Sequence, residues 1–284
     1  MPQIDYQDFI NQHQILVFDE KNNPDKGQRD VALAYQDTFL RYLQVINDQR
    51  KEGQKPYSIL HFYPLNVDTV YLGAKDKTLA QFSKGVEFLK EQGYVVSLRS
   101  HGGLGVVEDT GILNFALATD NRSVKLAIEE AYQLIIDLVQ ASLDNSLKVE
   151  AYEIVDSYCP GSYDIVIKNK KVGGIAQRRF KDGVTTAAYI GVQGDQIQRG
   201  ELMREFYKTS HADDRFPQVN PQSMTTLSDL IGQEMTVADY QNRLLQVFNA
   251  YNKVQFGNYG DEQLHKLYLP LFDKAFQRSQ QIQA

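Results

Sequence analysis

Cysteine is nearly absent from this sequence, since Cys159 is the only one in 284 residues. One cysteine cannot form an internal disulfide, so a fold held together by disulfides is excluded. No apolar run approaches the roughly 20 residues that a membrane-spanning helix needs. The start, MPQIDYQDFINQHQ, lacks the basic and apolar regions of a signal peptide. These absences predict a protein of the reducing cytoplasm that has no membrane partner.

Positive charge is also in short supply, with 30 lysines and arginines against 36 aspartates and glutamates and a formal net charge of −6. A general nucleic-acid binder usually has a basic domain, so we expect no nucleic-acid partner. The sequence lacks a zinc pattern, because a single cysteine cannot form a thiolate cluster and the histidines are scattered. We therefore expect no metal site; the five histidines are His13, His61, His101, His211 and His265.

The spacing of apolar residues predicts an α+β domain with a mixed sheet flanked by helices and a helical C-terminal extension. We expect an N-terminal extension at 1–26, a catalytic core at 27–195, and a helical C-terminal part at 196–284 packed on the same domain. Strands are predicted at 57–63, 69–72, 94–99, 112–119, 148–155, 164–169, 171–180 and 184–192. Helices are predicted at 26–49, 79–89, 124–138, 197–211, 223–231, 236–251 and 261–280.

The stretch DSYCPGSYDIVIKNKKVGGIAQRR places Cys159 among turn-forming residues. A lone cysteine is often a small buried apolar residue, but a core strand would not have this composition. The other interpretation is a nucleophile that Lys171, twelve residues later, keeps ionised. A neighbouring ammonium favours the thiolate and lowers the pKa of the thiol. Two strands joined by a short turn could return Lys171 to Cys159, although the sequence alone does not fix that register.

Two glycine clusters interrupt predicted strands. Gly173 and Gly174 indicate close approach of the backbone to a ligand or to another strand. The loop RSHGGLG joins two strands, so it is neither a phosphate-binding loop with Gly-Lys-Ser/Thr nor a dinucleotide fingerprint. Its glycines allow the backbone to approach a ligand, with Arg99 and His101 at the mouth. His101 is a possible acid or base, or simply a surface histidine.

Positive charge gathers locally around the second glycine pair. One interpretation is a protected, solvated strand edge. The other is an electropositive surface that steers an acidic partner to the protein despite its net charge. The residues are Lys168, Lys170, Lys171, Arg178, Arg179 and Lys181.

Three segments carry a family resemblance. RSHGGLGVVEDTGILNFALA resembles the glycine-rich motif of the biotin/lipoate protein ligase superfamily, and KVGGIAQRR resembles its lysine-bearing segment. EAYEIVDSYCPGSYDIVI is similar to the cysteine-bearing octanoyltransferases of lipoate assembly. The resemblance covers roughly residues 27 to 250. It implies a biotin-ligase-like mixed sheet and octanoyl transfer from the glycine cleavage H protein to lipoyl domains of oxo-acid dehydrogenases, without a cofactor.

The resemblance also implies roles for individual residues. Cys159 matches the nucleophile that forms an acyl thioester, and Lys171 matches the lysine that lowers its pKa. Arg99, His101, Gly102 and Gly103 fall on the glycine-rich loop that borders the acyl tunnel. Leu104 stands where adenylating ligases carry a third glycine, and Glu108 replaces a histidine common there; both departures disfavour an adenylate site. The substrate-binding set is Arg99, His101, Gly102, Gly103, Gly105, Gly161, Gly173 and Gly174.

Three alternatives stay open at this point. The donor could be octanoyl-acyl carrier protein, with the H protein as acceptor. The chain could instead be an ATP-dependent lipoate-protein ligase, which would release pyrophosphate. It could also be a non-catalytic module that binds lipoyl domains, in which case loss of Cys159 would leave its function intact.

Overall fold

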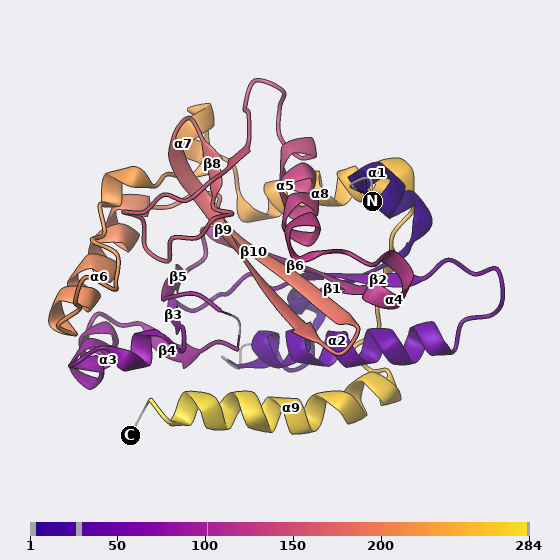
Figure 1. The fold of residues 1–284 in the computed structure, drawn as a ribbon, viewed down its shortest axis with the longest axis horizontal. Helices are drawn as coiled ribbons and strands as arrows, with labels where there is room; N and C mark the ends of the chain where they lie inside the picture. The colour runs from indigo at the N-terminus through magenta and orange to yellow at the C-terminus, as the bar shows by residue number, and fades with distance from the viewer. Residues whose placement is uncertain (1–3, 27–29, 101, 283–284) are drawn as a thin grey trace.

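The computed structural model describes residues 4–26, 30–100 and 102–282, and its centre is a mixed sheet (Figure 1). The strand order is β11-β1-β2-β6-β10-β9-β8-β7. β1 pairs in parallel with β2 and β11, and the remaining neighbours are antiparallel. This arrangement confirms the expected fold class. The strands are β1 (Gln14–Asp19), β2 (Tyr57–Phe62), β6 (Ile112–Asp120), β7 (Glu150–Ala151), β8 (Ile165–Ile167), β9 (Lys170–Phe180), β10 (Gly183–Gly191) and β11 (Gln255–Phe256).

A small second sheet has the order β4-β3-β5. Its strands are β3 (Thr69–Leu72), β4 (Val95–Leu98) and β5 (Val106–Glu108). The helices α3 (Phe82–Glu91) and α6 (Gln196–Thr209) lie beside it (Figure 1), and together they enclose a separate apolar core. The glycine-rich loop runs from β4 to β5, so the small sheet positions that loop.

Helices cover both faces of the large sheet (Figure 1). On one face α2 (Val31–Asp48) packs on the strands, and α9 (Glu262–Gln280) packs against α2. Because α2 lies between the sheet and α9, most of its side chains are buried. The rings of Tyr35 on α2 and Tyr268 on α9 stack with their centroids 4.3 Å apart. On the other face lie α1 (Tyr6–Gln12), α5 (Ile128–Ala141) and α8 (Val237–Tyr251).

The shorter helices connect these layers. Two are α-helical, α4 (Asn121–Val124) and α7 (Leu227–Ile231). Three are single 3₁₀ turns, η1 (Glu20–Asn22), η2 (Asp76–Thr78) and η3 (Pro221–Ser223). Within the described ranges no helix is both long enough and apolar enough to cross a membrane.

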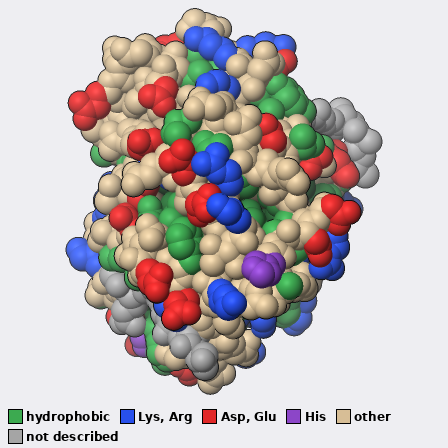
Figure 2. Space-filling view, turned by 90° about the vertical axis from the view of Figure 1, so that its left-hand side faces the viewer, with side chains coloured by type: hydrophobic (Ala, Val, Ile, Leu, Met, Phe, Trp, Pro, Cys, Tyr) green, Lys and Arg blue, Asp and Glu red, His purple; other side chains and the backbone are tan. Residues whose placement is uncertain are grey.

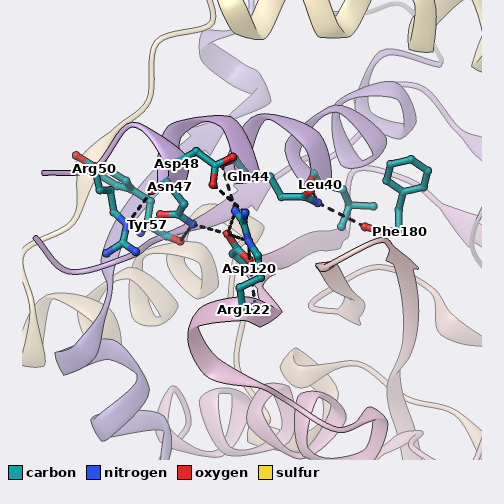
Figure 3. A network of polar contacts seen from close by, with 9 residues as sticks. All are labelled: Leu40, Gln44, Asn47, Asp48, Arg50, Tyr57, Asp120, Arg122 and Phe180. Atoms are coloured by element: carbon teal, nitrogen blue, oxygen red, sulfur yellow. Dashed lines mark hydrogen bonds and ion pairs between the residues drawn. The ribbon is translucent and has the colours of Figure 1, made fainter. Parts of the chain in front are cut away.

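A polar network fixes the C-terminal end of α2 to the sheet (Figure 3). The amide of Asn47 donates to the carbonyl oxygen of Tyr57 at 3.2 Å and accepts from its N–H at 2.8 Å. The same amide donates to Asp120, at the end of β6, at 3.3 Å. Arg122 then bridges Asp120 and Asp48. These bonds satisfy polar groups at the helix end that would otherwise be costly to bury.

Several segments differ from the expected elements. α1, β5 and β11 were not predicted, and the helix expected at 223–231 forms only at Leu227–Ile231. β1 was not predicted, because its apolar run is short and shows neither a helical nor an alternating period. The segment 148–155, expected as a strand, pairs only at Glu150 and Ala151. Beyond them the backbone leaves the sheet, and the N–H of Ile154 donates to the carboxylate of Asp164 at 3.0 Å. Side-chain capping therefore replaces the strand pairing there.

Candidate active site

Cys159 lies on a tight turn between β7 and β8, in a left-handed backbone conformation with φ of 50°. The two preceding residues, Ser157 and Tyr158, are fully buried and anchor the turn. The phenol oxygen of Tyr158 accepts from the amide of Gln196, the first residue of α6, at 3.0 Å. The half-buried thiol accepts two hydrogen bonds, from the backbone N–H of Leu104 and from the guanidinium of Arg99, each at 3.1 Å.

The glycine-rich loop supplies both donors. The N–H of Arg99 bonds to the carbonyl of Leu72 at 3.0 Å, which fixes the residue at the end of β4. Gly103 has φ of 98°, and a Cβ there would lie 2.6 Å from the Arg99 guanidinium and 2.9 Å from the Cys159 sulfur. Only glycine permits both this conformation and this approach. His101, expected at the mouth of the loop, lies outside the described residues.

The other expected loop glycines differ in their surroundings. Gly102 lines the cavity described below, and a Cβ there would contact nothing within 4 Å. Gly105 faces away from the cavity, because a Cβ there would lie 2.6 Å from the methyl of Met203 on α6. Gly105 therefore allows α6 to pack against the loop.

Lys171 reaches the cysteine turn from the start of β9. A two-residue hairpin returns the chain, with Lys168 and Asn169 both at positive φ, as a type I′ turn requires. The Lys171 ammonium donates to the carbonyl oxygen of Cys159 at 2.7 Å, and it lies 2.9 Å from the carboxylate of Asp164. Burial raises the pKa of Asp164, while the charge of Lys171 opposes that shift.

The expected glycine pair in β9 divides between the core and the cavity. Gly173 packs its Cα against the backbone of Tyr189 on β10, so it serves the pairing of the two strands. Gly174 lines the cavity, and a Cβ there would lie 2.8 Å from the Tyr189 ring. Gly161 also lines the cavity, on the turn just after Cys159.

A cavity of about 380 Å³ adjoins the thiol. That volume falls within the roughly 300–1,000 Å³ of small-molecule sites. Its outer wall includes Ile128, which is 52% exposed, and the stacked rings of Tyr132 and Tyr163. Its inner wall consists of buried residues from α2, the small sheet and the large sheet. These are Leu33, Tyr63, Tyr71, Val106, Ala187, Ala188 and Tyr189.

Polar groups at the inner end of this cavity were not assigned from the sequence. Burial raises the pKa of Glu108 to about 8, against the effects of a hydrogen bond from Asn114 and the charge of Arg99. The Asn114 amide donates to Glu108 at 2.6 Å. The buried amide oxygen of Gln36 has no hydrogen-bond partner among the described residues. Glu108 was noticed only as a departure from a family motif, and no pattern singled out Gln36.

The basic residues of β9 and its turns do not form one patch. Lys171 is buried, and Arg178 forms an ion pair with Asp37 on α2. Arg179 donates to the carbonyl oxygen of Leu126 at 3.0 Å. The face over α3 and α6 carries interspersed acidic and basic side chains (Figure 2). Among the described residues no group of three histidine, cysteine or carboxylate side chains could hold a metal ion.

The chain is similar to known proteins in sequence. The family described as lipoyl protein ligase A/B catalytic domain matches residues 30–249. A Listeria monocytogenes protein named lipoyl-GcvH:protein N-lipoyltransferase is 41% identical over 187 residues, which are 64% of this chain and 66% of that protein. A Lysinibacillus sphaericus protein named octanoyl-GcvH:protein N-octanoyltransferase is 37% identical over 217 residues, 74% of this chain and 78% of that protein.

A solved structure gives an independent likeness. The crystal structure of lipoate-protein ligase A bound with ATP superposes with a TM-score of 0.65, covering 93% of this chain and 95% of that chain. Its sequence is 20% identical, so this likeness shows the fold alone.

Proposed function

From the premise that this chain belongs to the lipoyl protein ligase A/B catalytic-domain family, we propose that it is an N-octanoyltransferase of lipoate assembly. It moves an octanoyl group from a lysine of the glycine cleavage H protein to a lysine of a lipoyl domain. The acyl group is carried on Cys159 between the two proteins. Relatives named octanoyl-GcvH:protein N-octanoyltransferase support the donor. The lipoyl domains of oxo-acid dehydrogenases are the proposed acceptors.

One observation carries the proposal: the only cysteine of the chain presents its thiol to a cavity, between hydrogen-bond donors from a glycine-rich loop. A structural cysteine would be expected among apolar side chains in a core. Cys159 does pack against the apolar core beside the small sheet, but it is only partly buried and lies in a left-handed turn, where residues other than glycine are uncommon. Strained conformations of this kind cluster at active sites.

The first half-reaction uses the thiolate as nucleophile. The sulfur attacks the carbonyl carbon of the octanoyl amide on the donor lysine, and a tetrahedral oxyanion forms. When it collapses, the carbon–nitrogen bond breaks and the donor amine leaves with a proton. The octanoyl group remains on Cys159 as a thioester.

The second half-reaction reverses these steps with the acceptor. Its lysine amine attacks the thioester carbonyl, loses a proton, and expels the Cys159 thiolate. Lys171 is the proposed proton donor to the departing amine and proton acceptor from the arriving one. Its hydrogen bond to the carbonyl oxygen of Cys159 supports this role, because it places the ammonium beside the reacting residue.

The cavity is the proposed binding site for the acyl chain between the departure of the donor protein and the arrival of the acceptor protein. The apolar residues of the inner wall, such as Leu33 and Val106, can enclose an alkyl chain. The exposed Ile128 marks the open side, from which the protein-borne lysine enters. Removing the chain from water favours the acyl-enzyme by burial of its apolar surface.

The test is the intact mass of the enzyme after incubation with octanoylated H protein. We expect an added mass of one octanoyl group that hydroxylamine removes and that an apo lipoyl domain discharges. Cys159→Ala should carry no adduct and transfer nothing while keeping the wild-type circular dichroism spectrum. Full transfer by that variant would exclude the thioester route and favour a binding module or a ligase.

Assays with different acyl donors, run side by side, decide between the remaining alternatives. Octanoyl-acyl carrier protein should acylate Cys159 much more slowly than octanoylated H protein does. Lipoate with ATP should give no pyrophosphate release. Faster acylation from the carrier protein, or lipoate-dependent pyrophosphate, would replace the proposed donor by the corresponding alternative.

A second acyl group is favoured by one specific observation. The Listeria relative, at 41% identity, is named a lipoyltransferase. Lipoylated H protein therefore belongs in the same assay as a second donor. A higher rate constant of acylation from lipoylated than from octanoylated H protein would change the acyl group of the proposal and leave its chemistry unchanged.

A further inference from the structure

We infer that Arg99, together with the backbone N–H of Leu104, is the catalytic group that holds the Cys159 sulfur as a thiolate, while the ammonium of Lys171 is neutralised elsewhere. The inference rests on the proposed function only in taking Cys159 as the nucleophile. It divides between two residues the roles that the sequence assigned to Lys171 alone. Arg99 was expected only as a substrate-binding residue.

The contacts of the sulfur are the first step. Sγ of Cys159 lies 3.1 Å from Nη2 of Arg99 and 3.1 Å from the backbone nitrogen of Leu104. The same Nη2 also donates to the carbonyl oxygen of Leu104, so the guanidinium and the loop are held to each other. A cation and an amide N–H that converge on one sulfur both favour its charged form.

The contacts of Lys171 are the second step. Its ammonium bonds to the hydroxyl of Ser157 at 3.1 Å and to the carbonyl oxygens of Tyr158 and Cys159 at 3.1 and 2.7 Å. It also pairs with Asp164 at 2.9 Å. An ammonium has three protons to donate, and all four of these contacts are to oxygens of the cysteine turn or of Asp164. The positive charge is therefore already balanced, and its bonds fix the backbone of the turn.

Arg99, in contrast, has no ion pair with a carboxylate among the residues that the structure describes. The carboxyls whose charges affect its pKa are Asp76 and Glu108. Burial raises the pKa of Glu108 to about 8, so this carboxyl is largely neutral at pH 7. Burial raises the pKa of Asp76 to about 6, so this group is mostly charged and attracts Arg99 only from a distance. The Cys159 sulfur is the group that the guanidinium contacts directly.

The contact between Arg99 and Cys159 also affects the pKa of Arg99. Burial acts to lower it, but the net shift is upward, and the charge of Cys159 and the hydrogen bond to its sulfur raise it more than the charges of Asp76 and Glu108 do. The other titratable groups that face the sulfur are Tyr189 on β10 and Tyr207 on α6. Burial raises the pKa of both phenols well above the usual value, so they remain neutral and do not compete for Arg99.

The test uses alkylation of the free enzyme by iodoacetamide, read by intact mass as a function of pH. Cys159 is the only cysteine, so the rate reports one thiol. We expect Arg99→Gln to move the midpoint of the rate profile upward by at least about one unit, which is a tenfold loss of thiolate at a fixed pH below it. Arg99→Lys should move the midpoint upward by less than Arg99→Gln does, because lysine keeps the positive charge but lacks the planar set of guanidinium donors.

The matched comparison is the double variant Asp164→Asn/Lys171→Met, which removes both charges of the buried pair together. Its midpoint should move less than that of Arg99→Gln. An unmoved midpoint in Arg99→Gln, or a larger shift in the double variant, overturns the inference. If Arg99→Gln does not fold by circular dichroism, Arg99→Met, which removes the charge and keeps most of the stem, is measured against the same criterion.

Alkylation needs neither donor nor acceptor protein, so its outcome is separate from that of the acyl-transfer assay. A depressed midpoint that depends on Arg99, in an enzyme that forms no octanoyl adduct, would support this inference and refute the proposed function. If the enzyme forms an octanoyl adduct but the alkylation midpoint does not depend on Arg99, the proposed function is supported and this inference is refuted.

Discussion

The ammonium of Lys171 and the carboxylate of Asp164 lie 2.9 Å apart, with side chains that are only 1% and 2% exposed. The pair joins β9 to the segment that follows the cysteine turn, and Asp164 also accepts from the N–H of Ile154. Neither charge can be solvated if the other is removed. The geometry of the cysteine turn therefore depends on this pair, even though the Cys159 sulfur itself is bonded to Arg99 and to the N–H of Leu104.

We predict that Asp164→Asn lowers the free energy of unfolding by about 3–5 kcal/mol, because it leaves a buried ammonium without a counter-charge. Urea titration of both proteins at pH 7 measures the difference. Asp164→Asn/Lys171→Met is the control, and it should be less destabilised than the single variant. A single variant within 1 kcal/mol of wild type would contradict a role for the buried pair.

We predict that Gly103→Ala lowers the rate of acyl transfer by at least about tenfold. The new methyl group would displace the Cys159 sulfur or the Arg99 guanidinium, and displacements near 1 Å at a reacting centre can cost about a hundredfold. The positive φ adds strain of roughly 1–2 kcal/mol. Initial rates with octanoylated H protein, together with a thermal melt, separate the two effects.

Gly102→Ala is the control for that prediction. Because Gly102 lines the cavity, the comparison is made on the free enzyme. A methyl group there meets nothing within 4 Å, so the rate at which iodoacetamide alkylates Cys159 and the melting temperature should both stay close to wild type. Equal losses of alkylation rate in Gly102→Ala and Gly103→Ala would show that the loop needs general flexibility and not the specific approach of Gly103 to the sulfur.

We predict that Glu108→Gln gains stability relative to wild type as the pH rises from 5 to 8. The folded-state pKa of Glu108 is raised to about 8, from a usual value of 4.5. Between these values the unfolded chain has lost the proton and the folded protein still binds it, so wild-type stability falls with rising pH. The amide removes that loss, on the order of a few kcal/mol.

Urea titrations of both proteins at pH 5, 6, 7 and 8 measure this difference. Glu129→Gln, at the exposed mouth of the cavity, controls for the removal of one carboxylate. A pH-independent difference between Glu108→Gln and wild type would mean that Glu108 titrates alike in the folded and unfolded states.

Local patterns in the sequence predicted most of the fold. The expected strands at 57–63, 69–72 and 112–119 correspond to β2, β3 and β6 within a residue or so. The expected helix at 261–280 corresponds to α9. The three strands are apolar runs with turn-forming residues beside them, and α9 has a helical period that begins after the N-cap Asp261, so neighbouring residues alone indicate them. β1 gives a weaker signal, because its apolar run is only four residues long, although all six of its residues are fully or partly buried.

The residues of the site also fall into two groups, those that local sequence indicates and those that only the packing of the fold brings together. The sequence indicated Cys159 and its turn, and the hairpin that returns Lys171 to that turn, because these are short-range features. The bond from Arg99 to the sulfur spans sixty residues and depends on how the small sheet packs on the large one. No local pattern encodes that packing. The neutral Glu108 and the unpartnered oxygen of Gln36 likewise exist only once the cavity has formed.

The final prediction concerns a contact between the C-terminal helix and the strand that leads to Arg99. The hydroxyl of Ser279 on α9 donates to Asp30 at 2.6 Å and accepts from the N–H of Leu98 at 3.3 Å. Leu98 is the last residue of β4, so α9 holds the end of the strand from which Arg99 projects. Ser279→Ala should lower the free energy of unfolding by about 1–3 kcal/mol, because a buried N–H loses this acceptor.

The same variant should also slow alkylation of Cys159 near neutral pH, since Arg99 is then less firmly placed against the sulfur. Rates of iodoacetamide labelling and urea titrations measure the two effects on one preparation. Gln277→Ala, exposed on the same helix, is the matched control and should change neither. Loss of stability with an unchanged labelling rate would show that α9 supports the fold and does not position Arg99.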